Sequence, residues 1–131
     1  MIVSDLIKRK VVTVKPDISI KEASKIMKRE GIGSLVIVNE DFSPIGIITE
    51  RDIVYAVADG IPLESKVAEI MSINPVTIDS NADISEALAL MTSRGIRHLV
   101  VVNKEGKVVG VVSITDVIKA VGVIALDLAI W

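Results

Sequence analysis

The chain repeats itself at a fixed offset of 64 residues, and this duplication constrains its fold more than any other feature. Residues 3–54 align with residues 67–118 without a gap, and 15 of the 52 aligned positions are identical. In a chain of this composition, chance gives about four or five identities. Self-similarity at a fixed spacing indicates one structural unit used twice. Any fold proposed for the chain must therefore place the same unit in it two times.

The first part of each half has the pattern of a strand followed by a helix. The extended segments "VVTV" and "PVTI" precede the amphipathic segments "DISIKEASKIMKREG" and "ADISEALALMTSRG". In the second of these, the apolar residues Ile84, Ala87, Leu88 and Met91 recur at the spacing of one helix face.

Both predicted helices also carry start and stop signals. Ser19 with Glu22, and Asp83 with Glu86, have the spacing of an N-cap and its N3 partner. A glycine closes each segment, at the position where a left-handed residue ends a helix. The pattern therefore predicts both ends of each helix.

The remainder of each half predicts two strands and a second helix. "LVIVN" and "LVVVN" are β-branched runs typical of buried strands, and each is followed by a polar turn and a second short strand. The predicted fold is α/β, of the α+β type, with a β-α-β-β-α unit repeated over residues 1–60 and 61–123 and an apolar tail at 124–131. Because each unit alone has too little core, we expect the two to pack about a pseudo-two-fold axis.

Composition excludes several classes of function. A net charge of −2 gives no electrostatic reason to bind nucleic acid, and the absence of cysteine removes disulfides and thiol chemistry and fits a reducing compartment. The first residues lack the apolar core of a secretory signal. The most apolar segment, residues 117–131, is interrupted by Lys119 and Asp127 and is shorter than the ~20 residues that cross a bilayer. We expect a cytoplasmic protein without a membrane segment, in which this tail is a packing helix.

Each half closes on a related motif, "GIITERDI" or "GVVSITDV". The motif residues are Gly46, Thr49 and Asp52 in the first half and Gly110, Ser113 and Asp116 in the second. The hydroxyl residue falls where the last strand passes into the second helix, and the aspartate falls one turn later. One interpretation is structural, because a hydroxyl N-cap with an acid three residues later forms a capping box.

The same motif also has the parts of a nucleotide site. A helix N-terminus offers backbone N–H groups to a phosphate, a hydroxyl adds a donor, and a carboxylate accepts the two hydroxyls of a ribose. A preceding glycine lets a ligand approach the backbone closely. The residues alone leave the cap and the nucleotide site as alternatives.

The duplicated unit, with G-h-h-[ST]-x-x-D at the end of each half, resembles the CBS domain, and the tandem resembles a CBS pair, or Bateman module, over residues 3–118. The resemblance implies one globule with two clefts between the repeats that bind AMP, ADP, ATP or S-adenosylmethionine. It implies that Asp52 and Asp116 hold ribose hydroxyls and that Thr49 and Ser113 contact phosphate. It also implies that adenine is lined by the backbone of Val12, Thr13 and Val14 in one half and of Val76, Thr77 and Ile78 in the other.

The two halves differ in charge near the motif. The second half has Arg97 and His98 before its buried strand, where the first has glycine and serine. In related modules, basic residues here reach a phosphate, which arginine binds through two hydrogen bonds. Arg51 is a second candidate, matched by Thr115 in the other half. The alternative is that these are ordinary surface side chains. With 2% aromatic residues, adenine would lie between aliphatic side chains.

The function predicted from the sequence is a non-catalytic regulatory module for energy sensing. The chain has one histidine, no cysteine and no nucleophile-elbow or phosphate-loop motif, so neither an enzyme nor a required cofactor is expected. The predicted ligand is AMP, ADP or ATP, the predicted assembly is a homodimer, and the signal is expected to pass to an unknown effector protein. The alternatives are a dimerisation or protein-interaction domain with vestigial clefts, a sensor of another adenosyl ligand such as S-adenosylmethionine, and, remotely, a small hydrolase.

Overall fold

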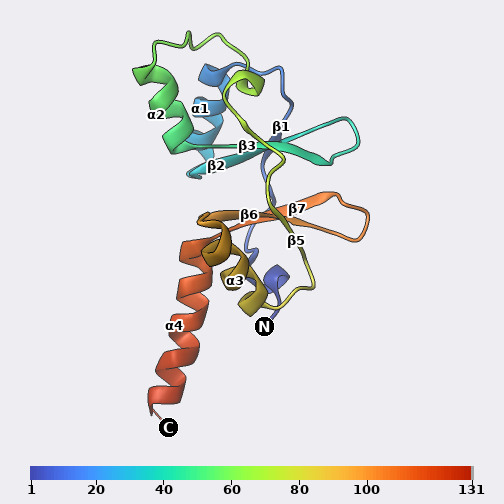
Figure 1. The fold of residues 1–131 in the computed structure, drawn as a ribbon, viewed down its shortest axis with the longest axis vertical. Coiled ribbons are helices and arrows are strands. Elements are labelled where there is room, and N and C mark those ends of the chain that lie inside the picture. The colour runs from blue at the N-terminus through green and yellow to red at the C-terminus, as the bar shows by residue number, and fades with distance from the viewer. Residues whose placement is uncertain (131) are drawn as a thin grey trace. The chain divides into compact units, whose positions relative to one another are not determined.

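The computed structural model describes the backbone of residues 1–130 and the side chains of residues 1–122. Its helices are η1 (Val3–Leu6), α1 (Ile20–Glu30), α2 (Glu50–Ala58), η2 (Val67–Glu69), α3 (Ile84–Arg94) and α4 (Ile114–Ile130). Its strands are β1 (Thr13–Val14), β2 (Ser34–Val38), β3 (Pro44–Thr49), β4 (Ser72–Ile73), β5 (Thr77–Asp79), β6 (His98–Val102) and β7 (Val108–Ser113). The predicted mixed fold, with the order strand, helix, strand, strand, helix in each half, is confirmed (Figure 1). The second half has one further strand, β4, which precedes β5.

The chain divides into two compact units, which are named here by their strands. The β1–β4 unit comprises residues 12–75, and the β5–β7 unit comprises residues 1–11 and 76–131. The predicted tail residues Ile124, Leu126, Leu128 and Trp131 lie outside the part of the chain whose side chains are described. The packing role of the tail therefore stays a prediction. The pseudo-two-fold axis between the repeats is also a prediction.

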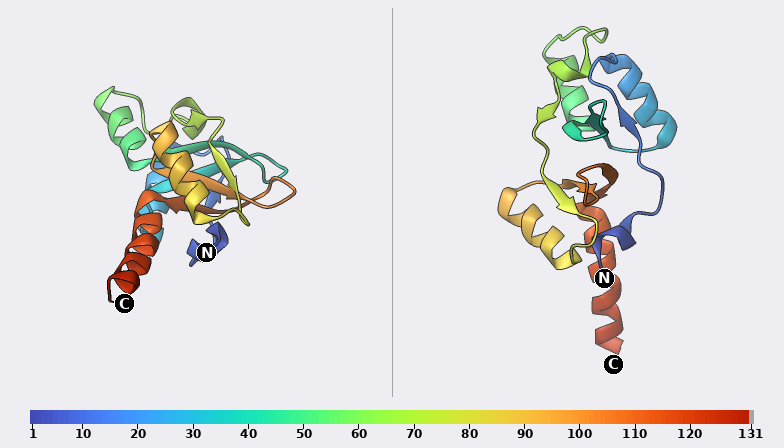
Figure 2. Two further views of the ribbon diagram at one scale, coloured as in Figure 1. Left: turned by 60° about the horizontal axis from the view of Figure 1, so that its bottom comes forward. Right: turned by 90° about the vertical axis from the view of Figure 1, so that its right-hand side faces the viewer.

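In the β1–β4 unit, two helices cover one face of a four-stranded sheet (Figures 1 and 2). The strand order is β1-β2-β3-β4, with β1 parallel to β2 and the other pairs antiparallel. Ser19 accepts a hydrogen bond from the Glu22 amide at 3.0 Å, and Gly31 ends α1 in the left-handed conformation, as predicted. Buried side chains of α1 and β2, among them Met27 and Leu35, form the core of this unit.

The β5–β7 unit has the same plan with three strands in the order β5-β6-β7. Ala87 and Met91 on α3 pack against Leu99 of β6 in its core, so the predicted helix face is confirmed. The start of α3 differs in detail from the prediction. Asp83 accepts from the amide of Ser85 at 2.8 Å, and this hydrogen bond lowers the pKa of the Asp83 carboxyl below its usual value. The Asp83 side chain thus caps α3 through the amide two residues later, and not through the predicted N3 residue, Glu86.

The first segment of each repeat packs in the unit formed by the other repeat. In the first pair of backbone hydrogen bonds, the amides of Val3 and Val67 donate to the carbonyls of Ala82 and Ile18. In the second pair, the amides of Ile84 and Ile20 donate to the carbonyls of Met1 and Ser65. Each pair follows the 64-residue offset. Val3 and Val67 are both fully buried, so the two segments contribute core side chains as well as hydrogen bonds. The boundaries of the compact units therefore differ from those of the sequence repeats.

This exchange gives the two motif glycines a packing role, and their expected role in admitting a ligand stays a prediction. A Cβ added to Gly46 would lie 2.9 Å from Cγ of Met71, which belongs to the segment after η2. A Cβ added to Gly110 would lie 2.6 Å from Cδ1 of Ile7, its counterpart after η1. Such distances are well below van der Waals contact, so the space that glycine leaves is already filled by the exchanged segment.

None of the helices within the described residues combines the length and the hydropathy that a membrane-spanning helix requires.

Candidate functional site

The motif of the β1–β4 unit lies where β3 passes into α2. Thr49 is the N-cap of α2, and its hydroxyl accepts a hydrogen bond from the Asp52 amide at 3.4 Å. Oδ2 of Asp52 accepts in return from the Thr49 amide at 2.8 Å and from the Thr49 hydroxyl at 3.2 Å. Both residues are half-buried. The structural interpretation of the motif, a capping box, is therefore present.

The β5–β7 unit repeats this arrangement where β7 passes into α4. Oδ2 of Asp116 accepts from the Ser113 amide at 2.8 Å, and the Ser113 hydroxyl accepts from the Asp116 amide at 3.1 Å. These residues are also half-buried. Each unit thus holds a hydroxyl and a carboxylate in a fixed position beside a helix N-terminus, whose first N–H groups favour an anion.

The start of the neighbouring strand lies directly beside each motif. Ser34 on β2 pairs with Thr49, and His98 on β6 pairs with Ser113. Side chains that are paired across two strands point to the same face of the sheet, so the half-buried His98 lies beside the Ser113 hydroxyl. The structure thereby places His98 beside the motif, and its expected contact with a phosphate stays a prediction.

The residue before each of these strands is joined to the helix itself. The carbonyl of Gly33 accepts from the Glu50 amide at 3.1 Å, and the carbonyl of Arg97 accepts from the Ile114 amide at 2.8 Å. Arg97 is exposed. The backbone of Arg97 is therefore hydrogen-bonded directly to the first residue of α4.

The segments predicted to line adenine lie at the same end of each sheet. Thr13 on β1 pairs with Val36 on β2, and Thr77 on β5 pairs with Val100 on β6. Because both pairs are parallel, β1 and β5 begin at the end of the sheet from which the second helix of the unit leaves. The remaining residues of these segments are the partly buried Val12 and Val76 and the buried Val14 and Ile78. Since the four aliphatic side chains pack against the two cores, these positions offer mainly backbone to a ligand.

The two remaining candidates occupy the second position of their helices. Arg51 on α2 and Thr115 on α4 are both exposed. They lie within the first turn, close along the chain to the motif. Their exposure leaves both the predicted role in phosphate binding and the surface alternative open.

Sequence analysis missed one residue at this site, Glu50. Its side chain lies over Gly33, because a Cβ added to that glycine would lie 3.5 Å from Oε1 and 3.6 Å from Cδ of Glu50. The available signal was the comparison of "TERDI" with "SITDV", which places glutamate opposite isoleucine.

Metal binding receives no support from the geometry. Within the described residues there is no group of three or more histidine, cysteine, aspartate or glutamate side chains arranged to hold a metal ion.

Comparison with known proteins identifies the duplicated unit. The family model for the CBS domain matches residues 3–59 and again residues 67–123. An uncharacterized 17.7 kDa protein of Acidianus ambivalens is 39% identical over 118 residues, which are 90% of this chain and 71% of that protein. An uncharacterized protein of Methanopyrus kandleri is 40% identical over 119 residues, 89% of this chain and 61% of its own length.

Solved structures agree with this match. The CBS domain protein PAE2072 from Pyrobaculum aerophilum, complexed with AMP, superposes with a TM-score of 0.84 at 33% identity, covering 88% of this chain and 89% of that one. The CBS domain pair of protein MJ0100, in complex with 5′-methylthioadenosine and S-adenosyl-L-methionine, superposes with a TM-score of 0.85 at 31% identity, covering 93% and 96%.

Proposed function

Because this chain belongs to the CBS domain family, we propose that it is a non-catalytic regulatory module that binds adenosine nucleotides and signals to a partner protein. AMP, ADP and ATP are the proposed ligands, and energy sensing in the cytoplasm is the proposed context. The observation that supports this most is the occurrence, in both units, of a hydroxyl and a half-buried carboxylate at a helix N-terminus. Similar structures contain AMP, or methylthioadenosine with S-adenosylmethionine.

The capping box and the ribose site are compatible functions of one aspartate. The hydrogen bonds described for Asp52 and Asp116 as acceptors all end on Oδ2. An ionised carboxylate has about four lone-pair sites on its two oxygens. Oδ1 can therefore accept ribose hydroxyls while Oδ2 holds the cap. The cap fixes the direction of the carboxylate before the ligand arrives, which lowers the entropic cost of binding.

We expect millimolar AMP, ADP or ATP to raise the melting temperature of the protein without being consumed. A ligand that binds only the folded state, at 100 times its dissociation constant, adds about 2.7 kcal/mol to the free energy of unfolding. Differential scanning fluorimetry measures the shift, and chromatography of the nucleotide afterwards detects turnover. Hydrolysis by the purified protein contradicts the non-catalytic part of the proposal. The lack of a shift with every adenosine compound, S-adenosylmethionine included, contradicts ligand binding.

A second candidate function is a dimerisation module in which the motifs act only as caps. It is favoured by apolar side chains that remain exposed on the second helix of each unit. Val54 on α2 and Ile118 on α4 are 61% and 59% exposed, and Val57 and Val121 are 59% and 40% exposed. Both pairs follow the 64-residue offset, so the two helices present equivalent apolar positions. Exposed apolar side chains that gather on one surface mark interaction sites, and a second copy of the chain is the proposed cover.

We expect the chain to form a homodimer through α2 and α4, whether or not nucleotide is bound. Light scattering should report twice the chain mass of 14.0 kDa. Val54→Glu and Ile118→Glu should each shift the protein towards monomer, because a charge would be buried in an apolar contact. Leu63→Glu, at an apolar residue 39% exposed between α2 and η2, is the matched control and should leave the dimer intact. A wild-type monomer at micromolar concentration contradicts the prediction.

A further inference from the structure

The two motif sites carry different charges on the residues that surround the helix N-terminus. In the β1–β4 unit, the Glu50 side chain occupies the space beside Gly33. Glu50 directly follows Thr49 in the sequence and is the first residue of α2. With Asp52, this places two carboxylates in the first turn of α2. An anion that approaches this helix N-terminus would meet them both.

The equivalent positions of the β5–β7 unit have the opposite character. Arg97 replaces Gly33, and Ile114 replaces Glu50, so one cation is gained and one carboxylate is lost. The only acid in the first turn of α4 is Asp116, which belongs to the motif itself. His98 adds an imidazole beside Ser113. This site therefore offers an anion a guanidinium and hydrogen-bond donors.

We propose that the two sites select adenosyl ligands by charge: the β5–β7 unit binds the phosphorylated nucleotide, and the β1–β4 unit binds an adenosyl ligand without phosphate. This inference rests on the proposed function, since it assigns ligand classes to the same two sites. Thioethers, sulfonium compounds and the free nucleoside belong to the second class. A carboxylate close to a phosphate repels it, and the repulsion increases as the distance between the two charges falls.

Arg51 does not restore the balance in the β1–β4 unit. It follows Glu50 by one residue, so its side chain leaves α2 about 100° further around the helix. Both residues are exposed, but the Glu50 side chain lies over Gly33, next to the strand start that carries Ser34. The Glu50 carboxylate is thus the charge that the structure places beside the strand start, while the Arg51 side chain leaves the helix in another direction.

Nuclear magnetic resonance can follow the two sites separately in the intact chain. The amide signal of Gly33 reports the β1–β4 site, and that of Arg97 reports the β5–β7 site. Titrations with AMP and with adenosine differ only by the phosphate. We expect AMP to bind about tenfold more tightly than adenosine at the Arg97 site and about tenfold more weakly than adenosine at the Gly33 site.

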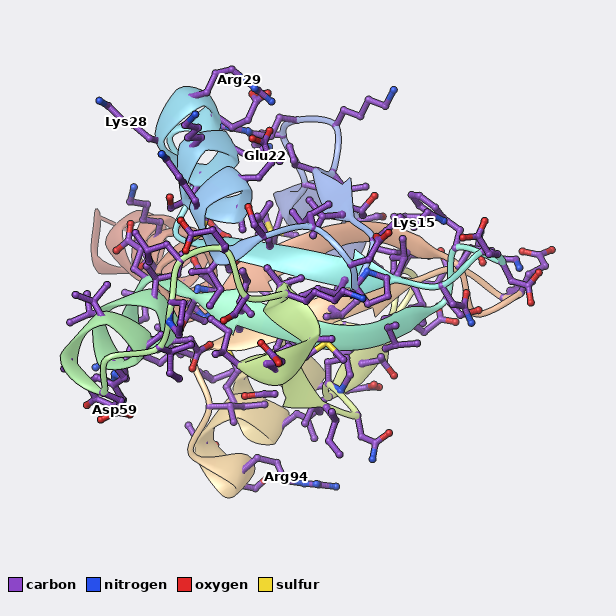
Figure 3. All side chains as sticks on the ribbon, turned by 90° about the horizontal axis from the view of Figure 1, so that it is seen from above. Lys15, Glu22, Lys28, Arg29, Asp59 and Arg94 are labelled. Atoms are coloured by element: carbon purple, nitrogen blue, oxygen red, sulfur yellow. The ribbon has the colours of Figure 1, made fainter. Side chains whose placement is uncertain are left out.

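Glu50→Gln tests the cause of the discrimination, because it removes the charge and keeps the shape. At the Gly33 site it should strengthen AMP binding about tenfold and leave adenosine binding unchanged. Glu22→Gln is the matched control, since Glu22 is likewise an exposed acid in the first turn of a helix of the same unit, α1 (Figure 3). This variant should change neither titration.

Each possible outcome bears on a separate claim. Binding of both ligands with the same preference at the two sites overturns the charge selection and leaves the proposed function in place. An equal effect of Glu50→Gln and Glu22→Gln also overturns it, because only the net charge of the protein would then matter. The absence of binding of either ligand at either site overturns this inference together with the proposed function.

Discussion

Removing the 2′-hydroxyl of AMP is expected to weaken its binding to the wild-type protein by about 1.5 to 3 kcal/mol, the range for a hydrogen bond to a charged group. This corresponds to about a 10- to 150-fold increase in dissociation constant. The physical reason is the free oxygen of the motif aspartate, which accepts the ribose hydroxyl while the other oxygen holds the helix cap. Isothermal calorimetry with AMP and 2′-deoxy-AMP measures the difference.

Alanine variants then assign the penalty to a unit. In Asp116→Ala, discrimination between AMP and its deoxy form should vanish at the β5–β7 site and persist at the other site wherever AMP binds there. Asp52→Ala should show the reverse. Both variants should also lose about 1 kcal/mol of folding free energy, because each removes a carboxylate from a cap.

Asp83→Ala separates the two effects. Asp83 caps α3 through the Ser85 amide and lies outside both motifs, so its removal should lower stability without changing either titration. Equal binding of AMP and deoxy-AMP by the wild-type protein would show that Asp52 and Asp116 are caps alone. The nucleotide orientation proposed for the two motifs would then be wrong.

The parts of the fold that depend on neighbours in the sequence could be predicted from it. The face of α3 formed by Ala87 and Met91, and the left-handed glycines Gly31 and Gly95, follow from helix periodicity and from the conformational freedom of glycine. The motif residues Thr49 and Asp52 also lie where the sequence places them, because a hydroxyl followed by an acid is a local signal for a helix start.

The contacts between distant segments could not be predicted in the same way. Nothing local in the first residues indicates that Val3 is buried in the unit of the second repeat, or that Ile7 fills the space beside Gly110. These contacts depend on which surface the chain meets after folding. The position of Glu50 over Gly33 is a contact of the same kind, since it requires the pairing of β2 with β3 and the start of α2.

Gly46→Ala is expected to destabilise the protein by about 1 to 3 kcal/mol, the usual cost of forcing an extra group into a packed core. The added methyl would lie 2.9 Å from Cγ and 3.2 Å from Cβ of Met71. Because these atoms are near the backbone, a rotation at the end of the methionine side chain does not relieve the contact. The segment after η2 would have to move away from β3. Urea denaturation followed by circular dichroism measures the change.

Gly122→Ala and the double variant Gly46→Ala/Met71→Ala make this prediction specific to packing. A Cβ at Gly122, within α4, meets nothing within 4 Å, so alanine there should stabilise the protein by about 0.5 to 1 kcal/mol through helix propensity. Gly46→Ala should cost much less in the Met71→Ala background, because Cγ and Sδ of the methionine are gone and only Cβ, 3.2 Å away, remains. If Gly46 instead served the approach of a ligand, Gly46→Ala would lower AMP affinity in the Met71→Ala background as well. Unchanged affinity in the double variant would therefore assign Gly46 to the exchanged segment, and a loss of affinity would return it to the ligand site.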